Sequence, residues 1–283
     1  MSNGGPGKRG NIAQPTATAD PWNTSTPNVA RIYDYYLGGK DNYTPDREAA
    51  RRVLGSAPDV PLAALENREF LRRAIQFLVE EAGIRQFIDI GPGLPTQGNV
   101  HEIAWQHDAS AHVVYVDNDP VVLAHGRAIL QTAASVRIIE GDVRRPEAIL
   151  ASTELRELID LSRPVALCMS LVLHFVTEDE DPYCCVGKLR DALAPGSYLV
   201  LTHVTGDERD VGTVSEITAV YDTATAPLVP RSREQVAKLF YGFELVEPGV
   251  VFLSQWRPTG EYYARGGTRW AYAGVGRKPE IRM

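Results

Sequence analysis

Strand-like and helix-like segments alternate between residues 86 and 205, and this alternation constrains the fold more than any other feature. Short runs rich in Val and Ile are each followed by a segment that opens on a proline or a capping residue. Repeated βα units of this kind form a parallel sheet with helices on both faces. Strands are predicted at 86–90, 113–116, 136–139, 165–170 and 197–202, with helices from residues 96, 120, 146 and 179.

The segments on either side of this alternation predict three units along the chain. Residues 1–25 are rich in Gly, Pro, Ser, Thr and Asn, a composition typical of a disordered tail. Residues 26–83 predict an N-terminal helical cap, and residues 84–283 predict the ligand-binding domain. The elements predicted outside the alternation are helices from Thr26 to Leu37, from Thr44 to about Leu54, and at 61–82, 211–222 and 232–240, and strands at 243–253 and 269–275.

Three successive strands finish in or near a carboxylate. Asp89 ends the first strand, Asp117 follows the second, and Asp142 comes shortly after the third. In open α/β sheets a ligand binds outside the carboxyl ends of the strands. A strand-end aspartate can also be a simple turn former. Three carboxylates in corresponding positions indicate instead that these residues line a pocket shaped for a nucleotide.

A glycine turn follows Asp89. Gly91 and Gly93 let the backbone bend sharply and approach a ligand. A dinucleotide fingerprint requires a third glycine where the helix packs on the strand, and Thr96 stands there instead. Pro95 is compatible with a helix start, because its missing N–H would be unpaired at a first helical position. A carboxylate so close to the turn suits an ammonium group better than a pyrophosphate, so NAD is the weaker hypothesis.

The spacing of the other two carboxylates favours an adenosyl ligand. Asp117 lies near the position at which an acidic residue accepts hydrogen bonds from ribose hydroxyls. Asp142, one strand further, is placed to reach an adenine amino group, although Glu140 competes for that role. An ammonium, a ribose diol and an adenine together describe S-adenosyl-L-methionine (SAM).

Three segments resemble one family of class I SAM-dependent methyltransferases, formerly catalogued as a domain of unknown function. They are the glycine block Asp89–Glu102, the N-terminal signature Arg31–Tyr43 and the run Tyr115–Pro120. The resemblance covers about Thr26 to the C-terminus, and Pro95 departs from the general D-x-G-x-G-x-G pattern. It implies a Rossmann-like, mostly parallel sheet of seven strands, whose last pair holds one antiparallel strand. It also implies SAM as cofactor and S-adenosyl-L-homocysteine (SAH) as product.

The resemblance extends the set of expected cofactor-binding residues. Asn118 follows Asp117, Val143 follows Asp142, and Ser170 ends the fourth strand, so all three are expected at the same edge of the sheet. The full set expected to bind SAM is Asp89, Gly91, Gly93, Pro95, Asp117, Asn118, Asp142, Val143, Ser170, Tyr33 and Asn42.

The N-terminal signature supports two interpretations. Tyr33 and Tyr36 share a helix face, which is typical of an aromatic core stripe. Alternatively the tyrosines form a lid over the sheet edge, where an aromatic face attracts a sulfonium by roughly 0.5–2 kcal/mol. Asn42 could then bond the ligand's carboxylate or amine, and Tyr36 is a candidate catalytic residue.

His174 follows the fourth strand, where the acceptor would sit in a class I enzyme. An unperturbed histidine titrates near neutrality and can act as a general base, although a lone histidine is as often a structural donor. His203 is a weaker candidate. The resulting hypothesis is a methyltransferase that acts on a small molecule by SN2 transfer. The alternative is a SAM-binding sensor or carrier without turnover.

Composition restricts partners and location. The net charge of −7 argues against a nucleic-acid substrate, because phosphate contacts need clustered Lys and Arg. No apolar run approaches a membrane span, and the N-terminus lacks the apolar core of a signal peptide. Cys168, Cys184 and Cys185 show no metal-ligand spacing, so no metal is expected. A cytoplasmic protein with reduced thiols is predicted, and no feature indicates its oligomeric state or acceptor.

Overall fold

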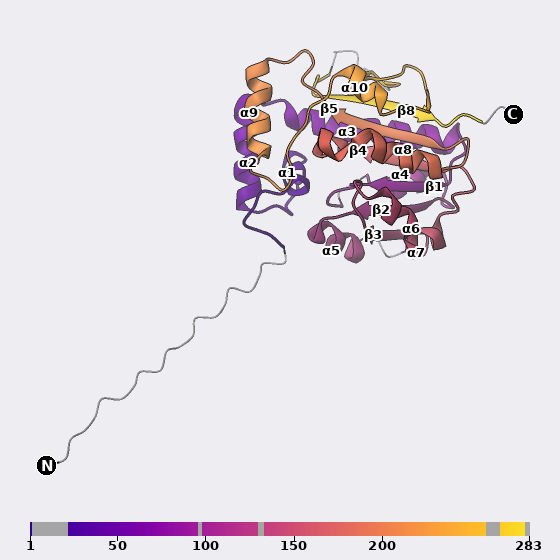
Figure 1. Ribbon diagram of the computed structural model, residues 1–283, viewed down its shortest axis with the longest axis horizontal. Helices are drawn as coiled ribbons and strands as arrows, with labels where there is room; N and C mark the ends of the chain where they lie inside the picture. Colours follow the sequence, from indigo (N-terminus) through magenta and orange to yellow (C-terminus); the bar gives the residue numbers. More distant parts are fainter. Residues whose placement is uncertain (2–21, 96–97, 130–132, 259–266, 281–283) are drawn as a thin grey trace.

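The computed structural model describes residues 1, 22–95, 98–129, 133–258 and 267–280. The tail predicted at residues 1–25 falls mostly on residues 2–21, outside the described residues. The described chain forms a central sheet with helices on both faces and a group of helices at one end (Figure 1). No helix in the described part is long and apolar enough to cross a membrane.

The sheet confirms the predicted fold class. Its strand order is β3-β2-β1-β4-β5-β8-β6, with β7 also paired to β8. The order reverses between β1 and β4, which makes their carboxyl ends the switch point where ligands bind in such sheets. The strands are β1 (Gln86–Ile90), β2 (His112–Asp117), β3 (Val136–Glu140), β4 (Ala166–Ser170), β5 (Tyr198–Val204), β6 (Glu244–Leu245), β7 (Val251–Phe252) and β8 (Ala271–Arg277).

The five parallel strands are buried on both faces. Every residue of β1 is buried, and Phe87 and Ile88 belong to hydrophobic clusters on opposite faces of the sheet. This explains why apolar residues occupy adjacent positions in the strand, at Phe87 and Ile88, instead of alternating with polar ones. In β1 only Asp89 carries a charge, and it lies opposite Tyr115 of β2 and Cys168 of β4.

The C-terminal part contains two short strands where one was predicted. β8 runs antiparallel to β5, and both β6 and β7 run antiparallel to β8. The predicted strand at 243–253 is interrupted by a turn in which Gly249 N donates to Val246 O. Pro248 in this turn has no N–H to offer a ladder. The sheet therefore has eight strands instead of the predicted seven.

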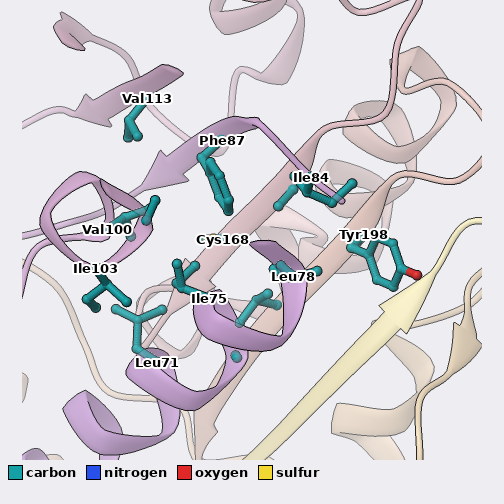
Figure 2. Close-up of a cluster of buried hydrophobic side chains, with 14 of the residues drawn as sticks. Leu71, Ile75, Leu78, Ile84, Phe87, Val100, Ile103, Val113, Cys168 and Tyr198 are labelled. Atoms are coloured by element: carbon teal, nitrogen blue, oxygen red, sulfur yellow. The ribbon is translucent and has the colours of Figure 1, made fainter. Parts of the chain in front are cut away.

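Helices cover the two faces in separate layers. The C-terminal half of α3, α4 and α5 pack on one face, and α6, α7, α8 and α10 pack on the other. Figure 2 shows Leu71, Ile75 and Leu78 of α3 against Phe87 and Tyr198 of the sheet. The helices are α3 (Val60–Glu80), α4 (Val100–His107), α5 (Pro120–Ile129), α6 (Pro146–Ala151), α7 (Thr153–Leu158), α8 (Pro182–Ala192) and α10 (Arg233–Lys238).

The remaining helices, α1 (Val29–Tyr36), α2 (Thr44–Ser56) and α9 (Val211–Tyr221), lie together at one end of the sheet (Figure 1). We call these three helices the cap. Their shared core contains Ile32, Val53, Ile217 and Trp270. The cap thus joins the predicted N-terminal helices to a later helix, while α3 starts in this core and continues onto the sheet.

Two predicted helix starts were wrong. α1 is capped by Asn28, whose side chain accepts from the backbone N–H groups of Ala30 and Arg31, and not by Thr26. α4 begins at Val100 after Asn99, whereas a start at Thr96 was predicted. Thr96 lies outside the described residues. Gly98 has a φ of +81°, so α4 does not extend back through this residue.

Candidate active site

A cavity of about 450 Å³ opens at the carboxyl ends of β1, β2 and β4 and extends beneath the cap. Its volume falls in the range of small-molecule sites, roughly 300–1,000 Å³. Most of the predicted site residues line it. Those that do are Tyr33, Tyr36, Asp89, Gly91, Gly93, Asp117, Asn118, Asp142, Val143, Ser170 and His174.

The glycine turn forms one wall of the cavity. Gly91 and Gly93 have φ values of +70° and +68°, a backbone conformation that L side chains rarely adopt. A Cβ on Gly91 would lie 2.5 Å from a methyl group of Val172. Both the conformation and the close approach therefore require glycine at this position. Pro95 follows the turn and is not among the residues that line the cavity.

Asp89 places a buried carboxyl at the cavity wall. Its side chain is 4% exposed, and no described residue donates a hydrogen bond to it. Burial raises the pKa of Asp89 to about 7, the charge of Asp117 adds to this effect, and Arg68 opposes it. A buried carboxyl with this pKa is readily ionised by a cationic ligand, because a nearby positive charge favours its charged form.

Asp117 is held in place by the backbone around it. One carboxylate oxygen accepts from Gly93 N at 3.3 Å, and the other accepts from Asp119 N at 2.9 Å. Burial still raises the pKa of Asp117 to about 6, although these hydrogen bonds favour the ionised form. The carboxylate faces the cavity from the end of β2, next to the glycine turn.

Beyond β3, the charged side chains at the edge of the cavity already form ion pairs and hydrogen bonds with one another. Arg144 binds Asp142 at 2.6 Å and Glu180 at 2.8 Å, and the side-chain amide of Asn118 donates to Asp142 at 3.3 Å. Burial alone would raise the pKa of Asp142, but the hydrogen bonds from Arg144 outweigh it, and the pKa lies below its usual value. Asp142 lines the cavity and Glu140 does not.

A hydrogen-bond chain links the cap to the ends of β4 and β5. The hydroxyl of Tyr33 donates to Ala64 O at 3.2 Å and accepts from Asn67 Nδ2 at 3.0 Å. The side-chain amide oxygen of Asn67, Oδ1, accepts from the Ser170 hydroxyl at 3.1 Å and from the Thr202 hydroxyl at 2.8 Å. This chain fixes Tyr33 and Ser170, both of which line the cavity.

Tyr36 and His174 lie deeper, where α1 faces the segment after β4. The Tyr36 hydroxyl is buried beside that of Tyr221 and has no other partner among the described residues. Burial, followed by the neighbouring His203 and the charge of Arg231, lowers the pKa of His174 well below its usual value. The expectation that His174 titrates near neutrality was therefore wrong.

Asn42 lies away from the cavity lining. Its side-chain amide donates to Asp34 at 2.7 Å and to Gly39 O at 3.1 Å, which closes the loop after α1. A Cβ on Gly39 would overlap the Asp34 carboxylate, so this glycine belongs to the same loop. This part of the N-terminal signature builds a turn.

Sequence reasoning missed Asn67 and Arg68 of α3. Arg68 lines the cavity, lowers the pKa of Asp89 by its charge, and holds its guanidinium 5.7 Å from the centre of the Tyr33 ring. A signal did exist for Asn67. It falls three and four residues before Phe70 and Leu71, on the apolar face of the predicted helix, where a polar side chain needs a partner.

Comparisons with known proteins agree with this arrangement. A family described as S-adenosyl methyltransferase matches residues 15–279. The chain is similar to a candidate methyltransferase of Thermobifida fusca YX, with 40% identity and a TM-score of 0.86, covering 92% of this chain and 98% of that one. A DUF574 family protein of Streptomyces avermitilis MA-4680 shows 38% identity and a TM-score of 0.86, covering 90% and 99%. No curated protein matches.

A more distant likeness concerns the fold alone. The CMeT domain of the citrinin polyketide synthase shares 13% identity with this chain at a TM-score of 0.52, covering 88% of this chain and 60% of that one.

Proposed function

We propose that this chain, which belongs to the S-adenosyl methyltransferase family, transfers a methyl group from SAM to a small molecule bound beneath the cap. The observation that carries the proposal is one continuous cavity with two different halves. Buried carboxylates line the half at the sheet edge, and apolar and aromatic side chains line the half under the cap. The first suits a charged, ribose-bearing donor, and the second suits an acceptor.

SAM is the cofactor of the family, and the residues at the sheet edge fit it. Asp89 lacks a hydrogen-bond donor among the described residues and would accept the ammonium group. Asp117 would accept the ribose hydroxyls, and Asn118, Asp142 and Val143 would surround the adenine. Arg68, beside Asp89, would bind the carboxylate of the amino-acid part.

When bound, SAM supplies an electrophilic methyl group that passes to the acceptor by SN2 transfer. The chain contributes mainly position and exclusion of water. Such alignment can supply roughly 7–11 kcal/mol of a reaction barrier. Tyr33, fixed by Asn67, and the apolar wall of the cap close the cavity over the sheet edge.

Proton transfer is a minor part of this proposal. His174 lines the cavity, but its lowered pKa makes it a weak base at neutral pH. We assign it a hydrogen-bonding role toward the acceptor. An acceptor that already carries a nucleophilic lone pair needs no stronger base before methyl transfer.

The proposal is tested by incubating the protein with SAM tritiated in the methyl group and a fractionated small-molecule library. We expect label to appear in a small-molecule fraction, together with SAH, and to be reduced by Asp117→Asn when SAM is subsaturating. SAM binding without label transfer across the library would contradict the methyltransferase proposal and favour a carrier or sensor.

A further inference from the structure

The charges of the cavity are segregated. Among described lining residues, the side chains with formal charge all lie at or beside the sheet edge; these are Arg68, Asp89, Asp117, Asp119, Asp142 and Arg144. The half under the cap is lined by neutral side chains such as Val53, Ile217, Leu228 and Trp270. A charged acceptor would lose its hydration there without gaining an opposite charge, which is costly.

Aromatic rings form much of this neutral half. Phe175 and Tyr221 both line the cavity, and their ring centroids are 6.0 Å apart at an interplanar angle of 36°. Tyr36 and Trp270 belong to the same cluster. Aromatic walls favour flat, ring-containing ligands through stacking and edge contacts.

Two buried polar side chains stand out on this mostly apolar surface. Tyr36 is 7% exposed and His174 is 3% exposed, and both line the cavity. Apart from the neighbouring Tyr221, neither the Tyr36 hydroxyl nor the His174 Nδ1 atom has a hydrogen-bond partner in the described part of the chain. Most buried polar groups in native proteins are paired, so unpaired atoms on residues that line a cavity point to a ligand.

The surroundings of His174 keep it neutral. The guanidinium of Arg231 is fully buried and donates to His203 Nε2 at 2.9 Å, so that nitrogen carries no proton. The other ring nitrogen of His203 donates to Val204 O at 2.8 Å. His203 is therefore a fixed neutral tautomer. Arg231 is also paired with Glu178 at 2.8 Å, so burial is the main reason that His174 stays neutral, and the Arg231 charge adds to it.

Building on the function proposed above, we propose that the acceptor is a neutral, mainly apolar aromatic molecule with small uncharged polar groups that hydrogen-bond Tyr36 and His174. The inference concerns recognition only. It does not depend on which atom receives the methyl group.

Calorimetric titration of the SAH-saturated protein with three probes of similar shape tests this inference. The probes are 2-naphthol, 2-naphthoate and 2-(aminomethyl)naphthalene at neutral pH, where they are neutral, anionic and cationic. We expect 2-naphthol to bind roughly tenfold more tightly than either charged probe (about 1.4 kcal/mol). Tyr36→Phe should weaken 2-naphthol binding by roughly threefold to tenfold, the range for a lost neutral hydrogen bond.

Tyr35→Phe is the matched control, since it makes the same change one residue earlier, outside the cavity lining. SAH binding by each variant shows that it is folded. Absent 2-naphthol binding, equal binding of a charged probe, or equal effects of the two variants would overturn the acceptor class and leave the proposed function standing. Failure of SAH to bind the wild-type protein would overturn the proposed function and this inference together.

Discussion

The backbone amide of Gly93 donates a hydrogen bond to the Asp117 carboxylate over 3.3 Å. This contact joins the turn after β1 to the end of β2, so the two parts of the expected cofactor site are built as one unit. The backbone N–H of Asp119 donates to the other carboxylate oxygen of Asp117 at 2.9 Å. The Asp117 carboxylate is therefore oriented before a ligand arrives, which lowers the entropy lost on binding.

SAH binding should release a proton below neutrality. Burial raises the pKa of Asp89 to about 7 and that of Asp117 to about 6, so both carboxyls are partly protonated near pH 6.5. An ammonium beside Asp89 favours its ionised form, which lowers its pKa. The affinity should therefore rise with pH between about 6 and 8. Calorimetry in buffers of different ionisation enthalpy measures the release, and Asp89→Asn should bind more weakly and release less. Proton uptake would contradict the assignment.

Arg68→Gln should weaken binding of ligands that carry the amino-acid part and spare those that lack it. We expect a loss of roughly tenfold to 150-fold for SAH, the range for a charge-assisted hydrogen bond. 5′-Methylthioadenosine keeps the adenosine but has no carboxylate, so its affinity should not change. Arg72→Gln, one turn along α3 and paired with Glu69 at the surface, is the control. An equal loss for both ligands would contradict a carboxylate contact.

Gly91→Ala should destabilise the protein more than Gly38→Ala. Both glycines have positive φ values, +70° and +76°, so both substitutions share the cost of that conformation, about 1 kcal/mol. Only at Gly91 does the new Cβ meet a side chain, Val172, whereas nothing lies within 4 Å at Gly38. We expect an additional loss of about 1–3 kcal/mol from the overlap. Urea unfolding measures the difference, and equal losses would show that the turn relaxes freely.

Asn28→Ala should reduce both stability and SAH affinity. The Asn28 side chain caps α1 and also donates to Asp119, which ties the cap to the cofactor rim. Loss of the N-cap alone costs about 1 kcal/mol. Asn28→Ser retains a capping oxygen but has no amide for Asp119, so it should keep most of the stability and still lose affinity. If Asn28→Ser binds SAH as the wild type does, the tie to the rim has no role in binding.

Local patterns were sufficient for the five parallel strands and for the carboxylates at their edge. β1 was predicted to the residue, because adjacent apolar residues such as Phe87 and Ile88 indicate a strand that is buried on both faces. The helix predicted from residue 232 was also confirmed, and a capping box of Ser232 and Gln235 starts it. The predicted start of α4 was wrong, although the spacing of Asn99 and Glu102, which form a capping box, is visible in the sequence. Pro95 and Thr96 presented an equally good signal a few residues earlier.

Tertiary features of the site could not be read from local patterns. Arg68 reaches Asp89 only because α3 packs across the sheet, and α3 shows a generic amphipathic spacing. The lowered pKa of His174 results first from burial and then from His203 and Arg231, both of which are distant in sequence. In both cases the packing of helices against the sheet determines which side chains become neighbours. Residue spacing identified the candidates, and the fold determined their chemistry.

The most direct test of the account is calorimetric titration with SAM and SAH of the wild type, Asp117→Asn and Asp179→Asn. Asp179 is an exposed aspartate outside the cavity lining and serves as the matched control. We predict binding of both ligands by the wild type and by Asp179→Asn, weakened roughly tenfold in Asp117→Asn (about 1.4 kcal/mol). Failure of the wild type to bind either ligand, or an Asp117→Asn affinity equal to that of the control, would contradict the cofactor site described here.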